Sequence, residues 1–462
     1  MSTDTRTAAD LAAVIESLDA VEGEVVTPDH PDYDSIRQVV PGDIDRRPAA
    51  IVRAASAVDV ARVVRLVGET GVPLAVRAGG HSGAGHGAVE GGIVLDLRDL
   101  DAFEIDPQER IASAGGGLTA GAYTAAAAQH GLATGFGDTG SVGIGGLATG
   151  GGVGFLSRKH GLTIDSLVSA QVVTADGSIV EVSEHSHPDL FWAIRGGGGN
   201  FGVVTRFTFR LHDVSEFTGG LLVLPATPEV VAGFVREALA APEELSTIAN
   251  VMPCPPLPFV PDSAHGQMVV FAFVAYAGPP ADAEQAVGRL RSLAAPLADM
   301  VQPGSYASMF QPEPPDYHPT AVARTLYLDH VDEASAAAII EQLESSDAPM
   351  RAVQLRPLGG AISRVASGAT AYAHREAPIM ANVASFYQGS GDRAAREAWV
   401  AGLVAALDQG IPGAYVNFLQ AEGEERVRAA YPSATWDRLA AVKRVYDPHN
   451  LFRGNHNIPP AE

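Results

Sequence analysis

The spacing of apolar and polar residues divides the chain into two parts with different patterns. Up to residue 212, short apolar runs predict strands, and stretches with apolar residues three and four positions apart predict helices. The expected strands are residues 50–54, 74–76, 93–97, 111–114, 166–175, 179–182 and 203–211. The expected helices are residues 8–18, 58–71, 120–130 and 189–194.

From residue 213 onward, apolar and polar side chains alternate over longer runs that are separated by helical segments. Strands are predicted over residues 218–224, 268–277, 322–330, 350–358, 380–388 and 413–420. Helices are predicted over residues 280–297 and 333–347 and from Trp436 onward. We therefore predict an α+β fold with an antiparallel sheet covered by helices in its second part. The change of pattern near residue 213 predicts a domain boundary at that point.

The composition is that of a soluble enzyme and argues against several kinds of partner. The net charge of −23 leaves no basic face for a nucleic acid. A membrane span needs about 18 consecutive apolar residues, and a signal peptide needs a basic start before an apolar core; the sequence shows neither. We therefore expect a cytoplasmic protein without a nucleic-acid or membrane partner, either a monomer or a homodimer.

Metal ligands are sparse in this sequence. The single cysteine, Cys254, excludes an intramolecular disulfide and a cysteine-based metal site. His185 and His187 supply two ligands, whereas zinc needs three or four at a fixed geometry. We therefore expect no metal site.

A glycine-dense segment, residues 77–87, follows one of the expected strands and carries His81 in its middle. Glycine allows positive φ and lets the backbone approach a ligand closely. Successive N–H groups in such a turn form a nest for an anion such as a pyrophosphate. This segment is therefore predicted to bind the phosphates of a ligand that lies against His81.

A second glycine-rich segment begins with residues 135–140, which match the pattern GxGxxG. A dinucleotide-binding fingerprint needs a helix directly after it. Here the glycines continue through residue 152, and each costs a helix about 1 kcal/mol, so we expect no ordinary helix at this point. A Rossmann-type NAD site is therefore not expected.

These segments, together with residues 141–154, 189–205 and 446–460, resemble the FAD-linked oxidases of the vanillyl-alcohol-oxidase (PCMH) superfamily, in the berberine-bridge-enzyme-like branch. The motifs stand in the family order and span nearly the whole chain. The resemblance implies a PCMH-type FAD-binding domain in residues 1–212 and a substrate-binding domain in residues 213–412. It also implies that residues 413–462 return to the FAD domain.

The resemblance implies that His81 carries FAD through a covalent bond. The family often adds a cysteine link at the position of Thr139, which lacks sulfur, so a single link is expected, as in singly linked bacterial members. His456 stands where the family usually has glutamine. For His86, a solvated or capping histidine is the alternative. The cofactor-binding residues implied are Arg77, Gly79, Gly80, His81, Ser82, Gly83, His86, Thr139, Gly140, Val142, Gly145, Gly146, Gly150, Gly152, Gly199, Gly202, Val204 and Asn455.

Tyr415 and Asn417 are the candidate catalytic residues. On the predicted strand over residues 413–420 their side chains share one face. Many family members place a tyrosine there near substrate and flavin; the alternative is a tyrosine packed in the core. As a base or proton relay, Tyr415 needs a cation or another partner, because its ordinary pKa is near 10. Gln354 and Arg356 share a face of a neighbouring strand and are weaker candidates for lining the pocket.

The activity implied is that of an oxidase acting on a small organic substrate. A hydride from a C–H beside an O–H or N–H passes to flavin N5, and O2 is reduced to hydrogen peroxide. Val142 matches a position where, in plant members, valine accompanies reactivity with O2 and leucine accompanies its loss. The alternatives are a dehydrogenase that uses another electron acceptor and a non-redox flavin-binding protein. The sequence does not identify the substrate.

Overall fold

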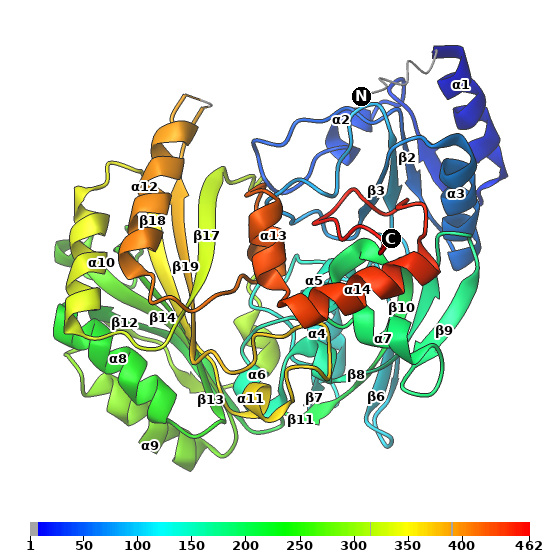
Figure 1. Cartoon of the computed structure of the whole chain (residues 1–462). Coiled ribbons are helices and arrows are strands. Elements are labelled where there is room, and N and C mark those ends of the chain that lie inside the picture. Colours follow the sequence, from blue (N-terminus) through cyan, green and yellow to red (C-terminus); the bar gives the residue numbers. More distant parts are fainter. Residues whose placement is uncertain (1–7, 315, 390) are drawn as a thin grey trace.

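The computed structural model describes residues 8–314, 316–389 and 391–462 (Figure 1). The first seven residues, on which the expectation of no signal peptide partly rests, lie outside this description. Two sheets occupy the first part of the chain. A four-stranded sheet has the order β1 (Glu24–Val26), β2 (Ala50–Arg53), β4 (Ile93–Asp96), β3 (Leu74–Arg77). A five-stranded sheet has the order β5 (Phe103–Asp106), β6 (Ile111–Gly115), β10 (Val203–Arg210), β8 (Leu167–Val173), β9 (Ile179–Ser183). The sequence predicted all of these strands except β1 and β5.

Helix α3 (Ala57–Thr70) holds the two sheets together. Its first turn is capped by the Ser56 side chain, and Gly71 ends it with a φ of 67°. Its buried valines belong to one core with Val173 and Val203 of the second sheet and with residues of the first sheet. The other helices of this part are α1 (Ala8–Glu16), α2 (Tyr33–Ile36), α4 (Ala120–Ala128), α5 (Ile144–Gly150), α6 (Ser157–His160) and α7 (Pro188–Ala193).

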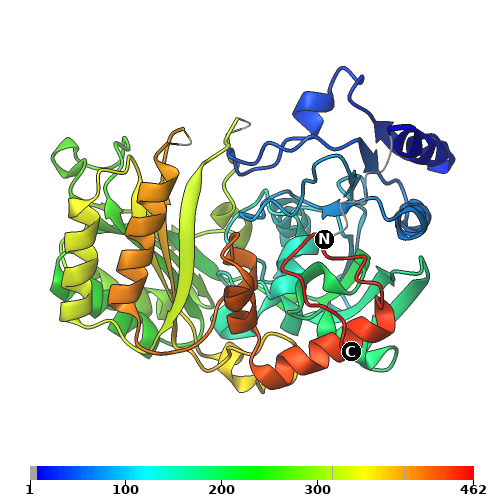
Figure 2. The ribbon, with the colours of Figure 1, turned by 45° about the horizontal axis from the view of Figure 1, so that its top comes forward.

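An antiparallel sheet dominates the second part (Figures 1 and 2). Its strand order is β15 (Ala298–Asp299), β12 (Phe217–Pro225), β14 (Met268–Ala277), β13 (Leu245–Pro253), β18 (Arg351–Pro357), β19 (Ile379–Phe386), β17 (Ala321–Leu328), and β16 (Gln302–Pro303) pairs with β12. Four helices pack on one face: α8 (Pro228–Ala240), α9 (Pro280–Arg291), α10 (Glu333–Ser345) and α12 (Arg393–Leu407). The prediction of an α+β fold with helices on one face of an antiparallel sheet is confirmed, although β13, α8 and α12 were not predicted.

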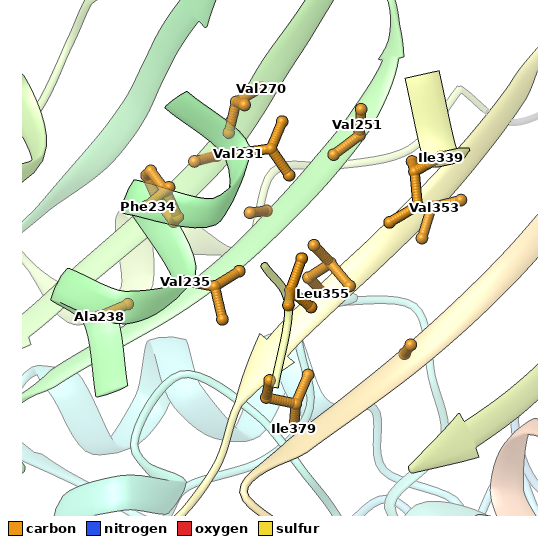
Figure 3. Packing of buried hydrophobic residues seen from close by; sticks show 14 of the residues in the cluster. Val231, Phe234, Val235, Ala238, Val251, Val270, Ile339, Val353, Leu355 and Ile379 are labelled. Carbon is orange, nitrogen blue, oxygen red and sulfur yellow. The ribbon is translucent and has the colours of Figure 1, made fainter. Parts of the chain in front are cut away.

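The core of the second part lies between this sheet and its helices. Figure 3 shows Val235 of α8 beside Leu355 of β18, and Ile339 of α10 beside Val353 of the same strand. Phe234 of α8 belongs to the same core cluster. All five side chains are buried. Burial of a side chain of this size contributes about 1.5–3 kcal/mol, so the helices are held to the sheet mainly by apolar contact.

The opposite face of the sheet is turned toward the first part of the chain and carries a row of polar side chains. Asn250, Gln354, Asn382 and Thr325 stand beside one another in register across β13, β18, β19 and β17. The Gln354 amide donates to Asn250 at 3.0 Å, and Thr325 accepts the Tyr415 backbone N–H at 3.4 Å. This face therefore contacts the segment that carries the candidate base.

Two local expectations are wrong. Residues 144–150 do form a helix, α5, in spite of their glycines. A Cβ on Gly145 would lie 2.6 Å from the Gly116 carbonyl oxygen, and one on Gly150 would lie 1.9 Å from Asn417 Oδ1. Close packing on two sides therefore requires these glycines, and the tertiary contacts outweigh their low helix propensity.

Residues 413–420 do not form a strand. Residues Val416–Phe418 form a 3₁₀ turn, in which the Phe418 N–H donates to the Tyr415 carbonyl at 2.9 Å. Helices α13 (Glu424–Ala430) and α14 (Ser433–Tyr446) follow, and α14 runs back across the first part (Figure 1). The buried Lys443 of α14 pairs with Asp447 at 2.7 Å and donates to the Asn200 carbonyl, which fixes the C-terminal segment there.

A buried ion pair joins the two parts of the chain. Arg375 makes a bidentate contact with Asp165, with N–O distances of 2.7 and 2.8 Å, and the two side chains are 0% and 8% exposed. In Arg375→Met, the carboxylate of Asp165 would stay buried without its counter-charge. We expect the free energy of unfolding to fall by about 3–5 kcal/mol.

The matched control is Arg206→Met, which removes a pair with Glu181 whose side chains are about half exposed. That variant should change the free energy of unfolding by about 1 kcal/mol or less. Urea unfolding followed by tryptophan fluorescence measures both. Equal shifts in the two midpoints would contradict the role given to Arg375.

Candidate functional site

A cavity of about 410 Å³ opens between the glycine-rich segments of the first part and the C-terminal segment. Its wall contains most of the residues that the sequence singled out. These are Arg77, Gly79, Gly80, His81, Ser82, His86, Thr139, Val142, Gly145, Gly146, Gly199, Gly202, Val204, Tyr415, Asn417 and Asn455. The segments around His81 and Asn455, which are more than 350 residues apart in the sequence, therefore line the same cavity.

Four predicted residues lie outside this lining. Gly83 packs on the Gln420 side chain, and Gly140 packs on Gly121 and Phe310. Gly150 touches Asn417, and a Cβ on Gly152 would lie 2.0 Å from Thr163 Oγ1. These four glycines therefore pack behind the residues that line the cavity.

The first two glycine segments touch backbone to backbone. A Cβ on Gly79 would lie 2.3 Å from the Gly143 amide nitrogen, and a Cβ on Gly143 would lie 2.3 Å from the Gly79 nitrogen. Gly80 has a φ of 73°, which favours glycine. The contact fixes the turn that carries His81 against the start of α5.

The side chain of Arg77 has a structural role. Its guanidinium pairs with Asp96 at 2.6 Å and also donates to the carbonyls of Ile36, Arg37 and Gln38. It is 2% exposed. The guanidinium hydrogen bonds are thus all made within the protein. Arg77 could therefore contact a ligand only through its backbone.

His81 is held by a hydrogen bond that crosses the cavity wall. Its Nε2 lies 2.9 Å from Ser141 Oγ, and the same hydroxyl donates to the carboxylate of Glu313. Burial lowers the pKa of His81 below its ordinary value of 6.5. The imidazole is therefore neutral at pH 7, which leaves one ring nitrogen with a free lone pair.

His86 is half-buried and contacts two other side chains. Its ring meets that of His456 edge to face, with 4.5 Å between the centroids, and Ser82 Oγ lies 3.3 Å from its Nδ1. Burial lowers the pKa of His86 to about 3. His456, where the family usually has glutamine, donates through Nε2 to the Leu419 carbonyl at 3.1 Å. The departure at position 456 therefore builds a pair of neutral imidazoles in the cavity wall.

The phenolic oxygen of Tyr415 collects three N–H donors. They are the backbone amides of Gly152 at 2.9 Å and Val153 at 3.3 Å and the Asn417 side-chain amide at 3.0 Å. Tyr415 and Asn417 thus meet through the 3₁₀ turn, although the strand predicted for them is absent. Burial raises the pKa of Tyr415 above 10, and the three donors and the charge of Arg356 oppose that rise.

Arg356 is a cation whose charge opposes the rise in the pKa of Tyr415. It pairs with Asp138 of the cavity wall at 2.7 Å and donates to Gln354 at 2.7 Å. Gln354 and Arg356 therefore do share a face, as predicted. Asp138 and Glu313 were missed. Asp138 lies inside the GxGxxG match, whereas no local pattern marks Glu313.

Within the described part of the chain, no three histidine, cysteine, aspartate or glutamate side chains are placed to hold a metal ion. None of the described helices is long and apolar enough to cross a membrane.

Comparison with known proteins identifies two families along the chain. Residues 48–183 match the FAD binding domain family, and residues 414–459 match the berberine and berberine-like family. The chain is 33% identical to (R)-6-hydroxynicotine oxidase of Paenarthrobacter nicotinovorans, over 96% of this chain and 97% of that protein.

Solved structures agree with this result. The crystal structure of 6-hydroxy-D-nicotine oxidase from Arthrobacter nicotinovorans superposes with a TM-score of 0.85 at 29% identity, covering 99% of this chain and 100% of that one. A glucooligosaccharide oxidase from Acremonium strictum, which carries a 6-S-cysteinyl, 8α-N1-histidyl FAD, superposes with a TM-score of 0.84 at 24% identity, covering 98% and 99%. The second likeness concerns the fold alone.

Gly146 tests whether FAD fills this cavity. Apart from its chain neighbours and the backbone of its own helix, a Cβ on Gly146 would meet no heavy atom of the described residues within 4 Å, although Gly146 lines the cavity. Gly146→Ala should leave the stability of the apoprotein unchanged or slightly higher, because alanine favours helix. The added methyl should lower the flavin-to-protein absorbance ratio several-fold. Gly288→Ala in α9, which is equally free of contacts, is the control and should change neither quantity. A full flavin content in Gly146→Ala would argue against this placement of the ring system.

Proposed function

Because the chain belongs to the berberine-bridge-like family of FAD-linked oxidoreductases, we propose that this enzyme is an oxidase that oxidises a small organic substrate and reduces O2 to hydrogen peroxide. The observation that carries the proposal is the Tyr415 oxygen, which receives three N–H donors in the wall of the same cavity as His81.

The residues present fit an FAD group. The glycine segments around Gly79, Gly143 and Gly199 expose backbone at the cavity, as a pyrophosphate and a flat ring system require. His81 would carry the single covalent bond. Thr139 has no sulfur, and Cys254 is buried in a separate core cluster, so neither supports a second link. When bound, FAD accepts a hydride at N5 from a substrate C–H.

Tyr415 is proposed as the group that takes the proton from the adjoining O–H or N–H. A neutral phenol needs at most two donors to fill its lone pairs, so three N–H donors favour the phenolate. The positive charge of Arg356 acts in the same direction. Asn417 positions the phenolic oxygen, because its amide donates both to that oxygen and to the Leu147 carbonyl of α5.

Hydrogen peroxide formation tests the oxidase assignment. A panel of amines, alcohols and oligosaccharides, with 6-hydroxynicotine included, is assayed for peroxide in air and for flavin bleaching without oxygen. We expect both signals with the true substrate. Bleaching without peroxide would indicate a dehydrogenase, and no bleaching with any compound would favour a flavin-binding protein.

Val142 lines the cavity, and its carbonyl accepts the Ala120 N–H at 2.9 Å. In Val142→Leu, the added methylene should narrow the approach of O2. Stopped-flow mixing should show slower reoxidation of the reduced flavin with nearly unchanged anaerobic reduction. A Val142→Leu variant that is reoxidised as fast as wild type would contradict the steric argument.

Tyr415→Phe removes the proton acceptor and keeps the ring. We expect anaerobic flavin reduction to slow by about 10²-fold, the scale of losing a general base. Because burial raises the pKa of Tyr415, the wild-type rate should increase with pH up to and beyond pH 10, and this increase should vanish in Tyr415→Phe.

Tyr123→Phe is the control, since this buried hydroxyl bonds Thr134 at 2.9 Å and does not line the cavity. An unchanged rate of flavin reduction in Tyr415→Phe would indicate that Tyr415 only packs in the core.

A further inference from the structure

We propose that Glu313 and Ser141 form a proton relay that fixes the tautomer of His81 and directs its Nδ1 to the covalent bond with the flavin. The inference rests on the proposed attachment of FAD to His81. Glu313 and Ser141, which are not part of the Tyr415–Asn417 pair, would promote attachment of the cofactor.

The direction of each hydrogen bond follows from which atoms of His81, Ser141 and Glu313 can donate a hydrogen and which can only accept one. A carboxylate only accepts, so the Ser141 hydroxyl hydrogen points to Glu313. The remaining Ser141 lone pair then accepts from His81 Nε2, which lies 2.9 Å away and must carry the ring hydrogen. The other nitrogen, Nδ1, is left unprotonated, and an unprotonated nitrogen is the one that can attack carbon.

Glu313 reaches this site from the second part of the chain. The segment around it is tied to the first part, because the Pro319 carbonyl accepts the Gly42 N–H at 3.0 Å and His318 Nδ1 donates to the Val39 carbonyl at 3.0 Å. The relay is therefore complete only when both parts have folded together. Attachment of the cofactor would then follow the assembly of the two parts.

His81 Nδ1 forms a bond to the 8α carbon, the methyl carbon through which the flavin of the oligosaccharide oxidase is attached. One C–H bond of that methyl and the His81 Nε2–H bond break, and the Nε2 proton passes through Ser141 to Glu313. The two electrons of the C–H bond remain on the flavin until O2 accepts them with two protons. Overall, one N–H and one C–H are lost, one C–N bond is made, and O2 becomes hydrogen peroxide.

The experiment follows covalent incorporation directly. Apoprotein from a riboflavin-starved host is mixed with FAD in air, and samples are precipitated in acid at intervals. Flavin fluorescence that stays with the polypeptide on a denaturing gel gives the rate of attachment, and acid-released flavin gives reversible binding. His81→Ala defines the background, because all its flavin should be released.

Glu313→Gln and Ser141→Ala should slow attachment about 10-fold or more, while reversible FAD binding is retained. Ser141→Thr keeps the hydroxyl and should attach flavin at nearly the wild-type rate. Asp316→Asn, an exposed carboxylate in the same segment, should behave as wild type. Ser141→Ala carries the test alone if Glu313→Gln fails to fold, since it removes only a half-buried hydroxyl.

Wild-type attachment rates in both relay variants would overturn the proposal, as would a link through Nε2 in NMR spectra of the flavin peptide. A wild-type protein whose flavin is all released by acid would also overturn it. The oxidase assignment is judged separately, because peroxide formation with reversibly bound FAD would still support it.

Discussion

The backbone contact between Gly79 and Gly143 is the constraint on which the site depends. With Cβ atoms excluded from both positions, two loops that are about sixty residues apart in the sequence approach to van der Waals distance. His81 sits two residues after one glycine and Ser141 two residues before the other, so the contact brings the imidazole within 2.9 Å of the hydroxyl. A side chain at either glycine would separate these groups.

The close contact between Gly79 and Gly143 also determines where Tyr415 and Asn417 lie in the cavity wall. Gly143 directly precedes helix α5 as its N-cap, and the backbone just after that helix supplies two of the donors to the Tyr415 oxygen. Gly150, at the end of the helix, leaves the space that Asn417 occupies. One glycine-rich helix therefore orders both the residue proposed to hold the cofactor and the residue proposed to accept the proton.

Charge around the cavity is largely neutralised by pairs within the protein. Arg77 is committed to Asp96, and Arg356 to Asp138. His81 and His86 are neutral because burial lowers their pKa values. The net negative charge of the chain is thus not concentrated at the cavity wall, where an anionic pyrophosphate would have to bind.

The sequence by itself determined the local features of this protein. The period of its apolar residues identified most strands and several helices, and residue type and short spacing marked the glycine segments around His81. The roles expected of His81, Thr139 and the Tyr415–Asn417 pair came from the family resemblance. Tertiary structure alone decided that residues 144–150 are helical, that residues 416–418 form a turn, that Arg356 pairs with Asp138, and that Glu313 contacts Ser141. Arg356 and Asp138 are 218 residues apart, and Glu313 and Ser141 are 172 apart. Contacts at such separations depend on how the antiparallel sheet docks against the first part of the chain, and no local propensity encodes that packing.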